Sequence, residues 1–515
     1  MCEPMSDFLN RPKTDAFYKL IGSSFILEWL FAFTLVVTAR LPYLLGQHVF
    51  FDGDEAIIGI MGRDLLSFNG LPFYFYGQQY GFSFFETLSA AFFILFLGSG
   101  VASLKLGGML LFSLGIQRFF KIFRWNQFSF SHYLLCSLVL VIFPSWLVWG
   151  TMLRGGYITA FVAFSFVIEY LIIHSIWKRR EWQVVTLMSS LIAVSQVFFI
   201  LPILPLLVFR LTRLSKRNMF FVSAWAILTF AALRLPAYLN PDFWTPTGLG
   251  SFHPQNISTF FLQDFWSYFS GFFSYEFAIE VPRLLGIGLR LFVLLLMGYV
   301  AILVLQNSKS INFQLLLLIL GTGLAILPIA LFEQASGRYV LGFQSGMLAL
   351  FVYVAVYSKH IEKHIRTAAL ALIVVVLLPV TMGLNTYVNS LLEPKLNDMQ
   401  ALNEMANALK SNEIENAIVL DWQLQWQLNY LMNDAMNFRS RWKEDRLTRY
   451  SEKVNDCYIQ DSCSIVVIGT HWSLSAVESA SYWQEKAILV NGRYFLLKNP
   501  EKEFYCEAQI FVPAL

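Results

Sequence analysis

Long apolar runs separated by short polar loops dominate the first 387 residues of this chain. A helix that crosses a bilayer needs about 20 mostly apolar residues, because its backbone polar groups must pair internally. Pro202 and Pro205 interrupt the middle of the pattern and favour a broken or strongly tilted helix pair there. The pattern predicts a polytopic α-helical membrane protein with about 11 transmembrane helices. The spans lie near 22–44, 101–120, 129–150, 157–176, 183–198, 199–211, 218–236, 285–305, 312–332, 339–358 and 367–387.

Lysine and arginine gather in four of the loops between these spans. Short loops rich in Lys and Arg stay on the cytoplasmic side of a membrane. With these loops inside, eleven spans place the N-terminus in the cytoplasm and everything after about residue 388 outside. The clusters are Arg118/Lys121/Arg124, Lys178/Arg179/Arg180, Arg210/Arg213/Lys216/Arg217 and Lys359/Lys363/Arg366.

A further apolar run, residues 84–97, is predicted to be a helix that lies at the membrane face. If it crossed the membrane, the Arg118 cluster would move to the outside, against the positive-inside rule. The first external loop, residues 45–100, is then long, partly helical and pressed against the bilayer. Long loops with structure of their own are usually functional.

The chain becomes polar and charged after about residue 388. The pattern there predicts a helix over 397–411, a strand over 416–421, a helix over 423–432 and a strand over 464–469. We therefore expect a transmembrane domain over residues 1–387 and a small extracytoplasmic α/β domain over 388–515.

The composition supports lipid as the main solvent, since 57% of residues are hydrophobic and only 14% are charged. These values exclude a soluble single-domain enzyme, a disordered chain and a fibre. No long basic tract is present to neutralise phosphates, so nucleic acid is not an expected partner. The five cysteines are scattered without metal-ligand spacing, and no metal site is assigned.

The densest group of acids, Asp52-Gly53-Asp54-Glu55, follows the first span directly. Three carboxylates within four residues repel one another, so a cationic partner is implied. In one interpretation Asp52 or Asp54 caps a helix over about 56–66, and the helix dipole favours Glu55. In the other, one carboxylate is a general base that takes a proton from an acceptor hydroxyl while its neighbour tunes its pKa. The local sequence leaves both open.

Aromatic and amide side chains alternate over residues 74–81 of the same loop. Tyr76, Gln78 and Tyr80 could stack against a sugar ring and bind its hydroxyl groups, together with Glu86. The alternative is an aromatic belt at the membrane interface, which explains the tyrosines well and the amides and Glu86 less well.

Two arginines lie on the side that the positive-inside rule disfavours. Arg154 precedes two glycines and Tyr157, and Arg338 lies between a glycine and Tyr339. A guanidinium group with its fork of donors binds phosphate well. The alternative is an ion pair with Glu333 or with the acidic cluster, and both interpretations can hold together.

These motifs, in this order, resemble those of the GT-C membrane glycosyltransferases. The resemblance is greatest to the bacterial group related to protein O-mannosyltransferases and the lipid A aminoarabinose transferase, in a subgroup with YGQ and RGGY motifs. The matching residues are Gly53 to Ala56 with Gly59 and Arg63; Tyr76 to Gln78 with Tyr80 and Glu86; Arg154 to Tyr157; Gly337 to Leu341; and Asp421, Trp422 and Tyr430.

The resemblance implies transfer of a sugar from a polyprenyl-phosphate donor to a lipid, glycan or protein acceptor, with inversion, outside the bacterial cytoplasmic membrane. Asp54 would be the base and Glu55 would assist or position it. Arg154, Arg338 and Tyr339 would hold the donor phosphate, and Tyr157 would join the sugar or acceptor site. Members of the family differ in whether a divalent metal takes part, so a metal cofactor stays open.

A polytopic transporter or flippase of lipid-linked sugars is the main alternative. Carriers commonly show inverted repeats or paired broken helices, and the sequence shows no repeat. A non-catalytic assembly factor that binds lipid-linked sugars is a third possibility; it would keep the aromatic residues and arginines but would not need Asp54.

Overall fold

The computed structural model describes the protein as two compact units, each assembled from separated parts of the chain. The first contains Met1–Leu41, Phe73–Glu86 and Gly108–Leu384, and the second contains Pro42–Pro72, Thr87–Gly107 and Asn385–Leu515. Within these ranges the described residues are 24–45, 49–76, 78, 81–174, 178–239, scattered positions between 287 and 298, 313–331, 340–357, 363–391, 399–411, 416–419, 422–433, 437–439, 465–469, 487–488, 495–498 and 504–513.

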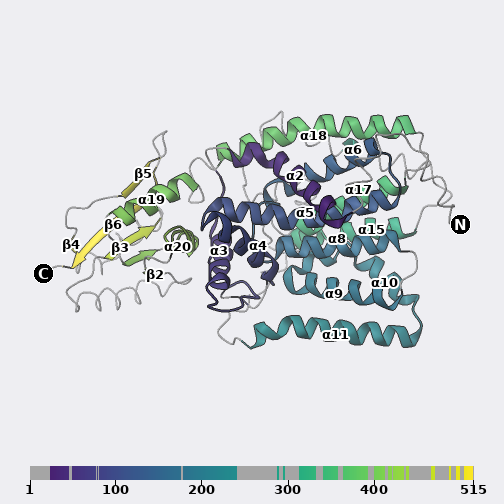
Figure 1. The fold of residues 1–515 in the computed structure, drawn as a ribbon, viewed down its shortest axis with the longest axis horizontal. Coiled ribbons are helices and arrows are strands. Elements are labelled where there is room, and N and C mark those ends of the chain that lie inside the picture. Colours follow the sequence, from purple (N-terminus) through teal and green to yellow (C-terminus); the bar gives the residue numbers. More distant parts are fainter. Residues whose placement is uncertain are drawn as a thin grey trace. The chain divides into compact units, whose positions relative to one another are not determined.

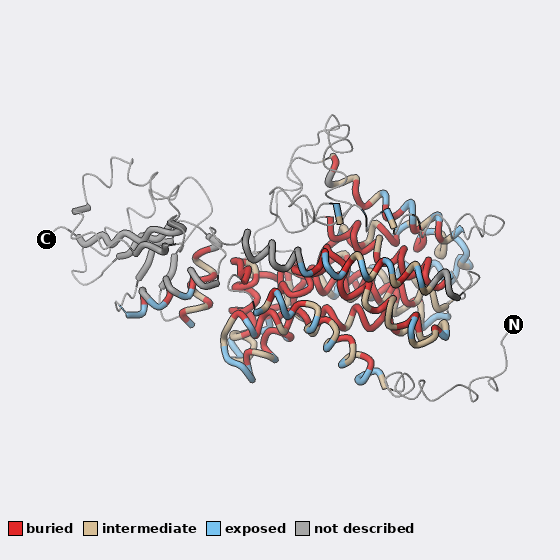
Figure 2. The backbone as a smooth tube through the Cα atoms, turned by 90° about the horizontal axis from the view of Figure 1, so that it is seen from above, coloured by how far each residue is buried: buried red, intermediate tan, exposed pale blue. Residues whose placement is uncertain are grey.

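The first unit is a bundle of helices that run side by side (Figure 1). Its α17 is buried along almost its whole length, whereas α11, at the lower edge of the bundle in Figure 1, exposes most of its side chains. Figure 2 shows buried residues through the middle of the bundle. The helices that contribute to this unit are α2 (Phe25–Leu44), α5 (Val101–Trp125), α6 (Phe130–Val141), α7 (Trp146–Trp149), α8 (Tyr157–Ile173), α9 (Arg179–Ser195), η2 (Val197–Ile200), α10 (Leu204–Thr212), α11 (Lys216–Tyr238), α15 (Phe313–Leu324), α16 (Leu327–Leu331), α17 (Val340–Tyr357) and α18 (Lys363–Leu391).

Close packing in this bundle depends on glycines and large aromatic rings. A Cβ at Gly108 of α5 would lie 2.7 Å from the Thr151 carbonyl oxygen, so only glycine allows that approach. The rings of Phe112, Trp146 and Phe161 form a buried cluster with centroids 4.4–5.4 Å apart. Such aromatic pairs contribute about 0.5–1.5 kcal/mol each beyond the area they bury.

Buried carboxylates also join the helices of this unit. Glu169 of α8 pairs with Arg118 at 3.3 Å and with Lys121 at 2.5 Å, both on α5. Glu28 of α2 accepts a hydrogen bond from Gln117 and pairs with Arg124 at 3.3 Å. The cluster Arg118/Lys121/Arg124, from which the sequence analysis predicted the membrane orientation, therefore also neutralises acids inside the bundle.

The protein is a polytopic helical membrane protein, as the apolar pattern predicted. Four of the described helices, α2, α5, α11 and α17, are long and apolar enough to cross a membrane. Described helices also lie at ten of the eleven predicted spans, and 285–305 falls largely outside the described residues. The number of crossings and the side of each terminus stay predictions.

Two breaks in the helices follow proline positions. The interruption expected from Pro202 and Pro205 is present, because α9 ends at Ser195 and α10 begins only at Leu204. Within the span predicted over 129–150 the helix is interrupted, since α6 ends at Val141 and α7 begins at Trp146. Pro144 lies between the two, and proline cannot continue the hydrogen-bond pattern of a helix.

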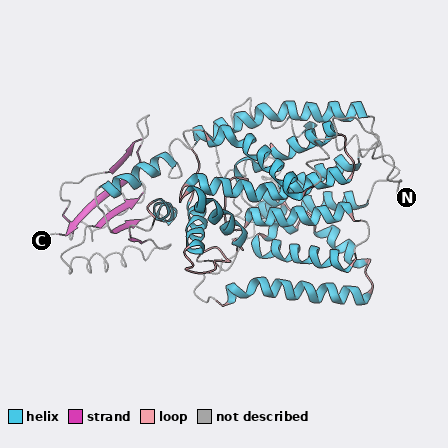
Figure 3. Cartoon of the chain, viewed as in Figure 1, coloured by secondary structure: helices cyan, strands magenta, loops and turns pink. Residues whose placement is uncertain are grey.

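The second unit combines helices with the strands of the C-terminal segment (Figure 3). Its helices are α3 (Gly53–Leu66), most of α4 (Phe84–Leu97), the start of α5, α19 (Met399–Ser411) and α20 (Trp422–Leu431). Its described strands are β1 (Asn416–Val419), β2 (Asn437–Arg439), β3 (Ile465–Gly469), β4 (Ala487–Ile488), β5 (Phe495–Lys498) and β6 (Phe504–Pro513).

These strands form a mixed sheet in the order β2-β1-β3-β6-β4, with β5 also paired to β6. β1 is parallel to β2 and β3, whereas β6 is antiparallel to β3 with Val467 opposite Gln509. The helices and strands predicted over 397–411, 416–421, 423–432 and 464–469 are all confirmed as α19, β1, α20 and β3. The domain boundary at residue 388 and the extracytoplasmic position of this segment stay predictions.

Candidate functional site

The acidic cluster opens α3 in the second unit, and each of its acids has a different environment. Asp52 has extended backbone geometry and its Oδ1 accepts the Glu55 backbone N–H at 2.9 Å. Asp52 is therefore the N-cap, which confirms the capping interpretation for this residue. Because the cap satisfies an N–H that the helix itself cannot pair, it fixes where α3 begins.

Glu55 is completely buried and its carboxylate binds the ammonium group of Lys105. Lys105 Nζ lies 2.8 Å from Oε1 and 2.6 Å from Oε2, and the lysine side chain is only 1% exposed. Lys105 belongs to α5, so the pair joins the starts of α3 and α5. This is the cation that the crowded acids require. The sequence contained its signal, a lone lysine near the start of an apolar helix, which indicates a function or a buried partner.

Asp54 is the least buried acid of the cluster, with intermediate exposure, whereas Asp52 and Glu55 are buried. It lies in the first turn of α3, between the cap and the ion pair. The positive end of the helix dipole stabilises a carboxylate in this place. Asp54 thus lies in the first turn of α3 and is the most accessible acid of the cluster.

α20 packs directly on α3 and supports the same cluster from the C-terminal segment. Gln427 is buried and donates from Nε2 to the Phe51 carbonyl oxygen at 2.6 Å. A Cβ at Gly59 would lie 2.4 Å from the Tyr430 ring, so glycine is needed for this contact. Arg63 donates to the Asn433 side chain at 3.0 Å. The motif residues around the acids therefore build the surface that receives α20.

Arg154 lies in the first unit, in the turn between α7 and α8. Its side chain is buried, and the guanidinium carbon lies 5.1 Å from the centre of the Trp149 ring. The Tyr157 ring packs on the same indole at 5.2 Å. An arginine held against an aromatic face keeps its planar donors in a fixed direction, which suits recognition of a phosphate.

The two glycines after Arg154 are required by backbone geometry. Gly155 and Gly156 have φ of +55° and +87°, a region that L-residues rarely adopt. A Cβ on Gly156 would lie 2.8 Å from the Phe82 carbonyl oxygen. The turn is also held by Gln196, which donates from Nε2 to the Gly155 carbonyl oxygen at 2.7 Å.

Glu86 caps α8 from 70 residues away in the sequence. Its carboxylate accepts the backbone N–H groups of Gly156, Ile158 and Thr159 at 3.0–3.1 Å, and its side chain is fully buried. Burial raises the pKa of Glu86 to about 7, while the backbone hydrogen bonds act in the opposite direction. These N–H groups bind Glu86, so an anion at the Arg154 turn depends on side chains for its donors.

The aromatic segment folds back on itself beside this turn. Tyr74 and Phe82 form a β-bridge, and their rings meet edge to face at 5.5 Å. Between them, Tyr76 and Gln78 are half-buried, and the Gln78 N–H donates to the Phe75 carbonyl oxygen. Tyr76, Gln78 and Glu86 thus belong to one continuous segment of the first unit, and Glu86 joins that segment to the Arg154 turn.

Three predicted site residues, Tyr80, Arg338 and Tyr339, lie outside the described residues. Across the parts of the chain that the structure describes, no three His, Cys, Asp or Glu side chains come together as a metal site would require. The roles of the remaining site residues stay predictions, and Lys105 is the residue that sequence reasoning missed.

No family model matches this chain, and no curated protein matches it either. Solved structures do. ArnT from Cupriavidus metallidurans bound to undecaprenyl phosphate matches with a TM-score of 0.60 and 11% identity, over 94% of this chain and 97% of ArnT. Its apo state gives 0.59 over the same shares. The arabinofuranosyltransferase AftD from Mycobacteria matches 95% of this chain but 41% of its own length, with 13% identity and a TM-score of 0.44. The chain therefore has the fold of ArnT along nearly its whole length.

Proposed function

We propose that this protein is a membrane glycosyltransferase that moves a sugar from a polyprenyl-phosphate donor to an acceptor on the extracytoplasmic side. The main support for this proposal is that the three acids at the start of α3 have different environments. Asp52 caps the helix and Glu55 neutralises Lys105, while Asp54 offers a partly exposed carboxylate. The ArnT fold supports the donor class, because the ArnT structure contains undecaprenyl phosphate.

In the proposed reaction, the Asp54 carboxylate accepts the proton of an acceptor hydroxyl. The hydroxyl oxygen attacks the anomeric carbon of the sugar, and the bond from that carbon to the phosphate oxygen breaks. Polyprenyl phosphate leaves with both electrons of that bond. Attack from the face opposite the phosphate inverts the anomeric centre. Glu55 acts as a positioning residue, because its pair with Lys105 fixes the first turn of α3.

Arg154 and Arg338, with Tyr339, bind the donor phosphate and stabilise the charge that develops on the leaving group. The fixed guanidinium group of Arg154 supports this assignment, since preorganised donors lower a barrier more than mobile ones. Tyr76, Gln78, Tyr80 and Tyr157 bind the sugar or the acceptor. Glu86 contributes by holding the Arg154 turn through the backbone of α8.

The test uses purified full-length protein in liposomes that contain polyprenyl-phosphate hexoses or pentoses, with lipid, glycan and peptide acceptors. Release of polyprenyl phosphate together with a glycosylated acceptor is the expected result. A flippase would move the donor across the bilayer without cleaving it, so the chemical products separate the two functions. Parallel reactions with a divalent cation and with a chelator decide whether a metal takes part.

Asp54→Asn should abolish product formation while the protein keeps its elution profile. Asp64→Asn is the matched control, because Asp64 lies on the same helix in its last turn. Product formation by Asp54→Asn at the wild-type rate would overturn the assignment of the base. A reporter fused after Leu515 tests the expected extracytoplasmic position of the C-terminal segment, which a cytoplasmic signal would contradict.

A further inference from the structure

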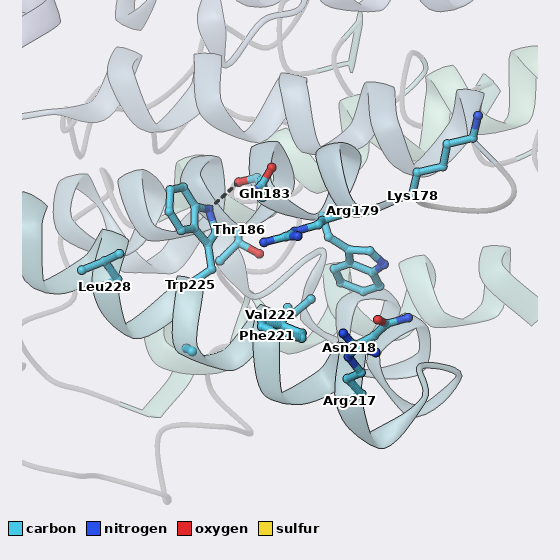
Figure 4. A pocket seen from close by; sticks show the side chains of 12 residues that line it. Lys178, Arg179, Gln183, Thr186, Arg217, Asn218, Phe221, Val222, Trp225 and Leu228 are labelled. Atoms are coloured by element: carbon cyan, nitrogen blue, oxygen red, sulfur yellow. Dashed lines mark hydrogen bonds between the residues drawn. The ribbon is translucent and has the colours of Figure 1, made fainter.

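A groove of about 510 Å³ lies between α9 and α11 in the first unit, away from the residues assigned above. Figure 4 shows that its two ends differ in chemistry. Lys178, Arg217 and Asn218 lie at one end, and Trp225 and Leu228 lie at the other. The groove therefore has a cationic end and an apolar end.

Both helices begin at the cationic end. From the cationic end to the apolar end, the lining residues run from Arg179 to Thr186 on α9 and from Arg217 to Leu228 on α11. The two helices therefore run parallel. Two helix N-termini thus add their positive dipole ends to the side-chain charges. The Ser215 side chain caps α11 by accepting the Asn218 N–H at 3.3 Å.

Two arginines, one from each helix, converge on a single aromatic ring. The guanidinium carbons of Arg179 and Arg217 lie 5.5 and 5.8 Å from the centre of the Phe221 ring. Among the described residues, no carboxylate pairs with either arginine. Glu181, the acid of that turn of α9, does not line the groove. Two cationic side chains beside one ring make this end of the groove positive, and an anion bound there would be attracted by both.

The rest of the groove is apolar and its walls are fixed. Trp182 and Trp225 face it from opposite helices, and Trp225 Nε1 donates to the Gln183 carbonyl oxygen at 3.1 Å. The outer surface of α11 exposes large apolar side chains such as Phe220 and Ile227 at 70% and 71%. In a membrane protein this surface faces acyl chains. A bound molecule that extends along the groove would therefore enter hydrocarbon.

We propose that this groove is a binding site for an anionic glycerophospholipid. The phosphodiester lies between Arg179 and Arg217, and an acyl chain lies along Trp225 and Leu228. Arginine suits this role because its donors match phosphate oxygens. The cationic end belongs to loops that the sequence assigns to the cytoplasm, so the lipid comes from the cytoplasmic leaflet. The site is independent of the proposed glycosyl transfer.

The first measurement uses the wild-type protein in nanodiscs of phosphatidylcholine. Part of the lipid is replaced by phosphatidylglycerol with brominated acyl chains, which quench nearby tryptophan fluorescence, or by brominated phosphatidylcholine. Brominated phosphatidylglycerol should quench more strongly at equal content. Most of that difference should vanish in Trp182→Phe/Trp225→Phe. Equal quenching by the two lipids would overturn the proposal.

The second measurement compares charge variants by native mass spectrometry of the full-length protein with phosphatidylglycerol. Arg179→Gln/Arg217→Gln should weaken binding by about tenfold or more, because both charge-assisted hydrogen bonds are lost. Arg180→Gln/Arg213→Gln is the matched control, since it removes the same charge from neighbouring exposed arginines that do not line the groove. A similar loss in both variants would show general surface attraction and contradict the site.

Two competitors distinguish the source of the phosphate. Glycerophospholipid binding should persist in the presence of millimolar inorganic phosphate and of polyprenyl phosphate at equal concentration to the lipid. Displacement by inorganic phosphate would reduce the groove to a simple anion site. Preferential binding of polyprenyl phosphate would show that it holds the donor carrier, and either result would overturn the proposal.

Discussion

The helices α3 and α8 both begin beside a proposed functional residue, yet their first turns are capped in opposite ways. α3 is capped by Asp52, the residue directly before it. The residue before α8 is Gly156, which has no side chain, and Glu86 supplies the acceptor from a distant stretch of the chain. The Asp52 cap is local, whereas the Glu86 cap also ties the start of α4 to the Arg154 turn.

The two starts also differ in how they accommodate a buried carboxylate. Glu55 is neutralised by a cation, Lys105, whereas the described contacts of Glu86 are with backbone N–H groups. The ion pair joins α3 to α5, but loss of either partner leaves the other buried as an unpaired charge. At Glu86 the interaction is shared among several backbone donors, and no cation is lost if the carboxyl group becomes protonated. The comparison therefore predicts different responses to substitution and to pH.

Loss of Lys105 should have the largest effect on stability. Lys105→Met leaves the Glu55 carboxylate buried without its cation, which costs about 3–5 kcal/mol in similar pairs. Equilibrium unfolding in mixed detergent micelles measures this loss. Glu55→Gln/Lys105→Met removes both charges and should recover much of it. A double variant as unstable as Lys105→Met would contradict the view that charge neutralisation is the main role of the pair.

Removal of the distant cap should have the next largest effect. Glu86→Ala removes the acceptor of three N–H groups at the start of α8. Each donor left unpaired costs about 1–3 kcal/mol, but water can enter the space of the lost side chain, so we expect a total loss of about 1–3 kcal/mol. The same unfolding measurement tests this. Thr87→Val is the control, because Thr87 is the next residue and is as buried as Glu86. Valine has almost the same shape as threonine. An equal loss of stability in Glu86→Ala and Thr87→Val would contradict the capping role of Glu86.

The pH dependence should separate Glu86 from Glu86→Gln. The folded-state pKa of about 7 lies above the ordinary value of 4.5, so the folded protein binds this proton more tightly than the unfolded chain does. Stability from this group is present below pH 4.5 and falls as pH rises towards 7, by at most about 1.4 kcal/mol per pH unit. Glu86→Gln should flatten this part of the profile. Identical slopes in the two proteins would contradict the raised pKa.

The local cap should have the smallest effect. Asp52→Ala removes one acceptor from the start of α3 and should cost about 1 kcal/mol, whereas Asp52→Asn should cost little because Asn caps equally well. Thermal unfolding followed by tryptophan fluorescence can compare the three proteins. A loss for Asp52→Ala larger than that for Glu86→Ala would reverse the ranking of the two caps.

The same contrast explains what could be predicted from the sequence. Apolar length and proline positions predicted most helices and the break at Pro202, because lipid imposes rules that act along the chain. Asp52 could be assigned as a cap candidate because an N-cap acts on residues two or three positions later. The interruption between α6 and α7 was not predicted, although Pro144 lies within it and proline cannot continue a helix.

The partners of the buried acids could not be found in the same way. Lys105 lies 50 residues after Glu55, and Glu86 lies 70 residues before Gly156, so no local spacing joins them. Only the folded backbone brings these groups together. A lone lysine in an apolar helix was a signal that some partner existed, but it did not indicate which acid. The sequence places two glycines after Arg154, and their positive φ in the structure is a sufficient reason for glycine at both positions.

The rate of polyprenyl phosphate release by Asp54→Asn, measured beside donor binding, tests the central claim most directly. A lost general base should lower the rate by at least about 100-fold, while donor affinity stays within about threefold of wild type. Asp64→Asn, on the same helix, should keep both values. An Asp54→Asn protein that releases polyprenyl phosphate as fast as Asp64→Asn would contradict the account.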